Sequence, residues 1–415
     1  MTLPIRLLPV EERWGCHCCG ICCRGVVIPL DHGELQRLRQ QKWHEHPEFR
    51  GKRLIVRLGF LRPFYRLAHR KDGYCVFFTA EGRCRIHEVF GEAAKPVVCR
   101  MFPYQLVALE HFAYLTVRRD CPSAAVGRGR PLAEQEGAWR PLAEASRLAP
   151  LPEPPPPITA DFRGPWKLVL RVTDALERLL CDARFPLVRR LVHGLKFCEL
   201  LSQCRLGKLD EHQFAELVTM LEGSSPAEAA EVFRKREPPS RTGALLFRRT
   251  VGDYLRLHPK FVVENTWPAR VRWARTVLML ALGRGRLSHV SPLFPDTTFT
   301  GLERPLGHLG EDVLRPLNDY FQSMAISKRY AVCGRPGWPL VDRFRAMAAS
   351  YPVAMWFLRL TSAGRQPTAE DAVDAVITID RGESYSALFA RAHRQRLAAL
   401  VRLKQFERLV AWHAR

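Results

Sequence analysis

The sequence predicts an α+β protein in which a small cysteine-rich metal-binding domain with short strands is followed by a mostly α-helical domain. Nine of the 13 cysteines lie within the first 121 residues. The proline-rich run at residues 151–157 is typical of a stiff, extended linker. Beyond it, apolar residues recur mainly at helical spacing. We therefore expect a cysteine-cluster domain over residues 1–125, a linker over 126–160 and a helical domain over 161–415.

Short elements are expected around the cysteines. Residues 26–30 are apolar and predict a strand, which a capped helix follows. Residues 75–78 and residues 82–87 resemble the two arms of a hairpin that end in metal ligands. Residues 104–118 predict two strands joined by a turn. This second hairpin would bring Cys99 and Cys121 to the same end.

The remainder of the chain predicts a series of helices. Asp210 can cap one helix, which we expect to end at Gly223, and Ser225 opens a capping box that indicates the start of another. The last predicted helix has an apolar stripe and a basic face, which favours packing against the domain over lying on a membrane. Further helices are predicted at residues 168–179, 269–282, 340–350, 368–376 and 386–410.

Charge and hydropathy restrict the compartment and the partners. The chain carries 64 Lys and Arg against 42 Asp and Glu, a net charge of +22, which favours acidic partners. The longest run without a charged residue has 13 residues, at 346–358. A membrane-spanning helix needs roughly 20 apolar residues, so no span is expected. Prolines and an arginine interrupt the amino terminus before an export signal could form, and we expect a cytoplasmic protein.

The first cysteine cluster is the strongest functional signal. Five thiols fall within the eight residues 16–23, and thiolates this close repel one another unless a cation neutralises them. Disulfides are the alternative, but a reducing compartment disfavours them. The later Cys181, Cys198, Cys204 and Cys333 are scattered, and each is explained as a small buried apolar residue.

The predicted metal ligands combine this cluster with later cysteines. Four thiolates satisfy one zinc ion or one 4Fe-4S iron–sulfur cluster, so the N-terminal cysteines suffice for one site with spare thiols or for two sites. The sequence hardly distinguishes the two metals, but the adjacent Cys22 and Cys23 are awkward for a simple tetrahedral zinc site and favour iron–sulfur. His17 and His87 stand beside cysteines but are left out of the ligand set. The predicted ligands are Cys16, Cys19, Cys22, Cys23, Cys75, Cys84, Cys99 and Cys121.

The order of the cysteine blocks resembles a known family. Residues 16–23 read CHCCGICC, two cysteines with eight residues between them follow, and residues 95–103 read KPVVCRMFP. This order is similar to that of the putative zinc- or iron-chelating cysteine-cluster domain, whose members include flagellin lysine N-methylases. His87 and Lys95 stand where that family often has tyrosine and arginine.

The resemblance implies an S-adenosylmethionine-dependent protein-lysine N-methyltransferase whose substrate is a flagellin-like protein with acidic patches. The motif CxxxCxxC is absent, as is a GxGxxG after a predicted strand, so the donor would bind in another way, such as on an iron without a protein ligand. The substrate lysine must also lose a proton. Tyr104, Tyr114 and Glu88 lie near the ligands in sequence, but no residue is identified as catalytic or cofactor-binding.

A non-enzymatic alternative is a zinc-stabilised module that binds nucleic acid or an acidic protein. Residues 37–71 hold 11 Lys or Arg and two acidic residues, interleaved with aromatic residues, a composition used for phosphate contacts and base stacking. The simpler interpretation is a solvated basic face whose aromatic residues belong to the core, because no nucleic-acid module accompanies the charge. These aromatic residues are Trp43, Phe49, Phe60, Phe64 and Tyr65.

Overall fold

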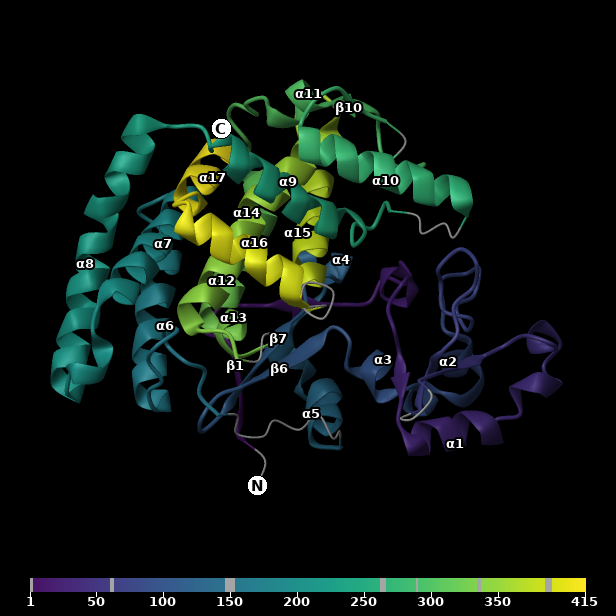
Figure 1. The fold of residues 1–415 in the computed structure, drawn as a ribbon. Helices are drawn as coiled ribbons and strands as arrows, with labels where there is room; N and C mark the ends of the chain where they lie inside the picture. Colours follow the sequence, from purple (N-terminus) through teal and green to yellow (C-terminus); the bar gives the residue numbers. More distant parts are fainter. Residues whose placement is uncertain are drawn as a thin grey trace.

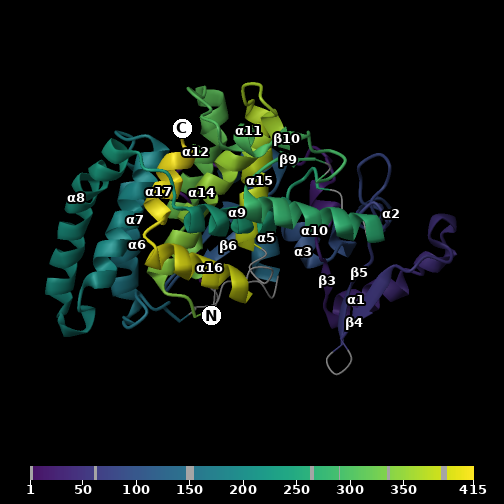
Figure 2. The same ribbon diagram turned by 45° about the horizontal axis from the view of Figure 1, so that its top comes forward.

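A cysteine-rich region of short strands and a region of packed helices lie side by side (Figures 1 and 2). The computed structural model describes residues 3–59, 63–145, 154–261, 266–288, 290–333, 337–384 and 390–415. Strands are concentrated before residue 132, and helices account for most of the chain after residue 165. The predicted α+β class with a mostly helical C-terminal part is therefore confirmed.

Two three-stranded sheets organise the cysteine-rich region. In one sheet, β3 (Pro29–Leu30) and β4 (Ile55–Leu58) both pair antiparallel with β5 (Phe64–Leu67). In the other, β7 (Ala113–Val117) runs parallel to β1 (Ile5–Leu7) and antiparallel to β6 (Tyr104–Ala108). Two-stranded pairs join β2 (Arg13–Trp14) to β8 (Arg130–Pro131) and β9 (Arg286–Leu287) to β10 (Thr297–Thr298).

Short helices connect these strands. Asp31 begins α1 as predicted, since its carboxylate accepts the Glu34 backbone N–H (2.8 Å) while the Glu34 carboxylate accepts the Asp31 N–H (2.9 Å). The helices are α1 (His32–Gln40), α2 (Arg85–Phe90), α3 (Val97–Met101), α4 (Pro122–Ala125) and α5 (Glu136–Ala145). The 3-10 helices are η1 (Ile21–Cys23), η2 (Trp43–Glu45), η3 (Pro47–Phe49), η4 (Glu92–Ala94), η5 (Leu132–Gln135) and η6 (Leu206–Lys208).

The aromatic residues of the basic insert mostly serve the core. Trp43 and Phe49 are buried, and the Trp43 ring lies 4.9 Å from the ring of Phe77. Phe64 differs, because 41% of it is exposed. Phe60 lies outside the described residues. The core interpretation therefore holds for the two residues at the start of the insert and is wrong for Phe64.

Much of the predicted linker packs against the cysteine-rich region. Within residues 126–160, β8 pairs with β2, and Leu132 and Trp139 are buried in the same apolar cluster as Leu115 of β7. Of the proline-rich run at residues 151–157, residues 151–153 lie outside the described residues, and the Pro157 carbonyl accepts the Leu340 N–H (2.7 Å). The three domain limits stay a prediction.

The helical region is built around α14 (Leu340–Ser362). Nearly all of its side chains are buried, and its residues 346–358 carry no charge. It contacts α7, α15 and α17, and α15 also contacts α12 and α4. The other helices are α6 (Trp166–Cys181), α7 (Leu187–Gln203), α8 (Glu211–Lys235), α9 (Arg241–Leu255), α10 (Trp267–Leu282), α11 (Phe299–Glu303), α12 (Glu311–Ile326), α13 (Arg329–Val332), α15 (Ala369–Ser384), α16 (Ala390–Arg402) and α17 (Phe406–His413).

Two helix limits predicted from sequence are wrong. A helix ending at Gly223 and another starting at Ser225 are in fact the single helix α8, because Leu221, Ser225 and Ala229 form a buried face and packing overrides the local breakers. The predicted helix at 386–410 is interrupted between α16 and α17. There Lys404 has a φ of 51°, and the buried Gln405 side chain accepts the Ser240 N–H (2.7 Å).

The first predicted hairpin also differs from the structure. Cys84 faces Phe78 in an isolated antiparallel bridge, so the chain does turn back after Cys75. The second arm is the helix α2 rather than a strand, however, and it begins at Arg85. In the part of the chain that the structure describes, no helix is both long and apolar enough to cross a membrane.

Candidate metal centre

The loop that holds the first five cysteines turns sharply at Gly20. Gly20 has a φ of 71°, and its carbonyl accepts the Cys23 N–H (2.9 Å) to close η1. A Cβ atom at Gly20 would collide with the ring of Phe78. Glycine therefore permits both the turn and the close approach of the second cysteine block. Within the turn, the Sγ atoms of Cys22 and Cys23 are 3.9 Å apart.

Backbone hydrogen bonds hold the second cysteine block against this loop. Cys75 N–H donates to the Cys23 carbonyl (2.7 Å), and Gly25 N–H donates to the Gly73 carbonyl (2.8 Å). A Cβ atom at Gly82 would lie 2.5 Å from the Cys18 carbonyl oxygen. The two segments therefore pack backbone to backbone, which places Cys75 beside the first cluster.

The other predicted ligands lie at short helices. Cys84 precedes α2, Cys99 lies within α3 and Cys121 precedes α4. The β6–β7 hairpin brings the last two together, since Arg118 N–H donates to the Pro103 carbonyl (2.8 Å) at the end where the chain enters and leaves. The prediction that Cys99 and Cys121 flank the same end of this hairpin is confirmed.

Cys22 influences the pKa values of most of the other N-terminal thiols. Its own pKa is raised, first by its contact with the Cys23 thiol and then by burial. Burial raises the pKa values of five further thiols, and the charge of Cys22 adds to each rise, while Cys84 acts in the same way on two of them. These five thiols are Cys16, Cys19, Cys75, Cys99 and Cys121.

These shifts bear on the chemistry that the thiols can support. Burial is the main cause that raises the pKa of Cys75 to about 11 and the pKa of Cys121 to about 12. The Lys95 ammonium opposes the rise in the pKa values of Cys22 and Cys99. At neutral pH these thiols therefore stay protonated unless a metal cation displaces the protons. Zinc or iron supplies such a cation, so the donor chemistry fits.

The side chains as described do not yet form a complete coordination shell. Among the residues that the structure covers, no group of three or more His, Cys, Asp and Glu side chains could hold a metal ion as it stands. The chain folding brings the eight predicted ligands to one region, and their assignment as ligands stays a prediction.

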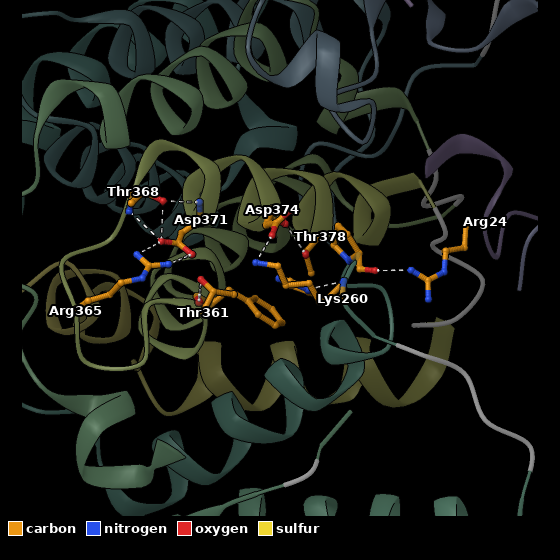
Figure 3. A network of polar contacts seen from close by, with 11 residues as sticks. Arg24, Lys260, Thr361, Arg365, Thr368, Asp371, Asp374 and Thr378 are labelled. Atoms are coloured by element: carbon orange, nitrogen blue, oxygen red, sulfur yellow. Dashed lines mark hydrogen bonds and ion pairs between the residues drawn. The ribbon is translucent and has the colours of Figure 1, made fainter. Parts of the chain in front are cut away.

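Helix α15 of the helical region is linked to the cysteine loop by Arg381 and, through Lys260, by Arg24, and Figure 3 draws the contacts of Lys260 and Arg24. Arg381 donates from Nη2 to the carbonyl of Ile21 (3.2 Å) and from Nη1 to the carbonyl of Leu257 (3.1 Å). Arg24, just after the cluster, donates to the Pro259 carbonyl (3.3 Å). The loop between α9 and α10 is in turn tied to α15 by the ion pair of Lys260 with Asp374 (2.9 Å).

A buried ion pair lies next to Cys121, the last of the predicted ligands. Asp380 of α15 is fully buried and pairs with Arg329 (2.6 Å), while its second oxygen accepts the Asp120 N–H (2.9 Å) next to Cys121. Sequence reasoning missed Asp380, Arg381 and Arg329. The sequence signal for this contact was that the charged Asp380 and Arg381 directly follow the mostly apolar residues 375–379.

Residues considered near the ligands have other contacts. His17 Nδ1 contacts the Ser123 hydroxyl, and His87 is exposed. The buried Tyr104 donates its hydroxyl to Gln135 (3.2 Å), and Glu88 pairs with Arg85 (3.4 Å) at the surface. Tyr114 lies edge-on to Phe112, 5.0 Å between ring centroids. Structural contacts thus account for each of the three residues considered as a base.

The helical region contains features separate from the cluster. Cys198 is completely buried, as predicted, whereas Cys181, Cys204 and Cys333 are half-buried. A cavity of about 530 Å³ lies among α7, α8, α14, α16 and α17 and shares no residue with the cysteine-rich region. Three of its lining carboxylates already pair with neighbouring cations, so its charges select no particular ligand. These ion pairs are Lys196–Glu199, Lys235–Glu231 and Arg408–Glu237.

Comparison with protein families gives one match. Residues 15–122 match the CxxCxxCC family, described as a putative zinc- or iron-chelating domain. The matched residues include all eight predicted ligands, which confirms the resemblance of the cysteine blocks and supports metal binding by this region. No curated protein and no solved structure matches the chain.

Proposed function

We propose that the cysteine-rich region binds zinc or iron through thiolates gathered around Cys22. The observation that carries this proposal is the set of thiols whose pKa values burial and neighbouring thiols raise, all within residues that match a putative metal-chelating family. Reduced thiols are required, so the proposal includes a reducing compartment such as the cytoplasm.

The spacing of two thiols bears on the kind of metal site. At a zinc–sulfur distance of about 2.3 Å, two thiolates on one tetrahedral ion stand roughly 3.8 Å apart. The Cys22 and Cys23 sulfurs are 3.9 Å apart, so both can bind one ion. We therefore propose a mononuclear site with these two ligands, and a 4Fe-4S cluster is the competing proposal.

Metal analysis tests both proposals. The full-length protein is purified without oxygen, its zinc, iron and sulfide are measured, and its visible absorbance is recorded. Colourless protein with stoichiometric zinc supports the mononuclear site. A brown protein with iron and inorganic sulfide in equal amounts supports the 4Fe-4S cluster. Protein that holds neither metal, and takes up neither after reduction, contradicts metal binding itself.

We further propose protein-lysine N-methylation as the reaction, with S-adenosylmethionine as donor and an acidic, flagellin-like protein as substrate. It is supported by the resemblance of the cysteine blocks to those of flagellin lysine N-methylases and by the hydrogen bond between the cysteine loop and α15. Calorimetry with the metal-loaded protein should show saturable donor binding. If protein with full metal content gives no heat of binding when S-adenosylmethionine is added, the proposed reaction is contradicted. The proposed metal site would be unaffected by that result.

A non-enzymatic alternative is binding of nucleic acid by the basic insert. Its support is that Arg50, Lys52, Arg53 and Arg57 are all exposed. Binding through phosphates weakens log-linearly with salt, and neutralising four contacting cations should flatten that slope by about four units. A salt series with the parent protein and the quadruple glutamine variant measures this. Negligible affinity at physiological salt rules the alternative out.

A further inference from the structure

Helix α10 carries an apolar stripe that faces away from the protein. Trp267 is 75% exposed, Val271 53%, Leu278 57% and Leu282 57%. They follow one another at intervals of four, seven and four residues, and the exposed Ala274 lies between Val271 and Leu278. Residues at this spacing share one helix face, so the five form a continuous stripe, here called the α10 stripe.

The opposite face of α10 already anchors the helix. Thr276 and Leu280 are buried, and Trp273 meets the Phe261 ring edge-on with 5.7 Å between centroids. The Arg256 guanidinium lies 5.5 Å from the centre of the Trp273 ring. Both ribbon views place α10 along the edge of the helical region (Figures 1 and 2). Among the described residues the α10 stripe therefore takes no part in the packing of the helical region, and an exposed apolar patch of this length indicates an interaction site.

Charge identifies the kind of partner. Residues 267–282 contain arginines and no acidic residue. Arg275 beside the stripe and Arg284 beyond its end are exposed, and the ion pairs in the described ranges include neither. A second copy would bring like charges together, which costs affinity, whereas an acidic partner would gain complementarity.

We propose that the α10 stripe docks an acidic amphipathic helix of a protein partner. Its apolar face would cover the stripe from Trp267 to Leu282, and its carboxylates would pair with Arg275 and Arg284. At 1.5 Å per residue the 16-residue α10 is about 24 Å long, so a partner helix of similar length suffices. This surface lies outside the metal-chelating region and does not depend on the proposed reaction.

The test uses two synthetic 16-residue peptides. One has leucines at the spacing of the stripe with flanking glutamates, and the other replaces each glutamate by lysine. Fluorescence anisotropy of the labelled peptides against the full-length protein should show saturable binding of the acidic peptide only. Leu278→Glu should weaken this binding at least about tenfold, because it places a carboxylate at the centre of the stripe. Arg275→Glu and Arg284→Glu should each weaken it about threefold, and less at high salt.

A matched control is available on α8. Met220 is 62% exposed and lies outside the α10 stripe, so Met220→Glu should leave peptide binding and thermal unfolding unchanged. Equal binding of both peptides, no binding of the acidic one, or no loss with Leu278→Glu overturns the proposal. Two further results also overturn it: sedimentation showing a dimer that Leu278→Glu abolishes, or Leu278-dependent binding to phosphatidylcholine vesicles containing phosphatidylserine.

Discussion

Arg381 Nη2 donates to the carbonyl of Ile21 at 3.2 Å, which joins the C-terminal part of α15 to the middle of the first cysteine cluster. Ile21 directly precedes Cys22, the thiol that contributes to the raised pKa values of most of the other N-terminal thiols. The same guanidinium also donates a hydrogen bond to the Leu257 carbonyl. A residue 360 positions away in sequence thus positions the candidate metal loop.

Arg381→Ala should weaken metal retention, because the loop loses the donor that fixes its backbone. Groups that orient metal ligands typically change affinity by about 10- to 100-fold, and we expect about tenfold in a chelator competition. Arg345→Ala is the control, since Arg345 donates to the carbonyl of Cys198 (3.3 Å), a cysteine outside the cluster. Equal metal loss from both variants would contradict a specific role for Arg381.

Cys22→Ser should lose bound metal and destabilise the cysteine-rich region, because metal-binding energy stabilises the fold there. We expect the same direction for Cys75→Ser and Cys99→Ser. Cys198→Ser should keep the full metal content even if it lowers stability, since Cys198 belongs to the helical core. Metal analysis together with circular dichroism separates the two effects. Full metal content in Cys22→Ser would show that the site is misplaced.

Gly20→Ala and Gly25→Ala form a matched pair. Both glycines have a φ of 71°, so alanine is strained by roughly 1 kcal/mol at either position. At Gly20 the new Cβ also collides with the Phe78 ring, whereas nothing lies within 4 Å at Gly25. We expect Gly20→Ala to be more destabilising by about 1–3 kcal/mol in chemical unfolding. Equal losses of stability in the two variants would show that the Phe78 ring can move aside at no cost in free energy.

Asp380→Asn should strongly reduce stability. It removes the carboxylate that pairs with the buried Arg329 at 2.6 Å, and loss of one member of a buried pair costs about 3–5 kcal/mol. Glu231→Gln is the exposed comparison, since its pair with Lys235 is about 60% exposed on both sides and solvent screening leaves such a pair a small contribution to stability. Urea midpoints measure the difference, and similar midpoints would contradict the buried charge pair.

His258 should make the fold sensitive to acid. Burial, and then the charges of Lys260 and Arg381, lower its pKa well below the usual value, and its Nδ1 accepts the Lys260 N–H (3.1 Å) between the rings of Phe294 and Phe357. Below pH 6.5 the unfolded chain binds a proton that the folded chain excludes, so stability falls as pH falls.

Unfolding free energies at pH 7.5 and pH 5.5 test this relationship. The contribution of His258 should be about 1.4 kcal/mol lower at pH 5.5, following one proton bound in the unfolded state. His258→Phe should lack this part of the pH dependence, whatever its stability at pH 7.5. Parallel pH profiles for the parent and His258→Phe would show that the ring is protonated in the folded state.

Local sequence determined the features that depend on neighbouring residues. The α1 capping box needs only Asp31 and Glu34 three residues apart, and the β6–β7 hairpin needs only alternating residues around a turn. The cysteine spacing likewise identified the metal-chelating region, because ligands for one metal must lie close together on a short loop.

Tertiary structure decided what depends on residues far apart in the chain. Packing against the bundle made α8 continuous through Pro226, and the contact of Gln405 with Ser240 divided the last helix. Likewise, the periodicity that predicted α10 could not show that its Trp267 face lies in solvent. The link from Arg381 to the cysteine loop has no local signature either, since a backbone carbonyl accepts the hydrogen bond and every residue carries one. Such contacts follow from where whole helices pack, and local spacing does not encode that placement.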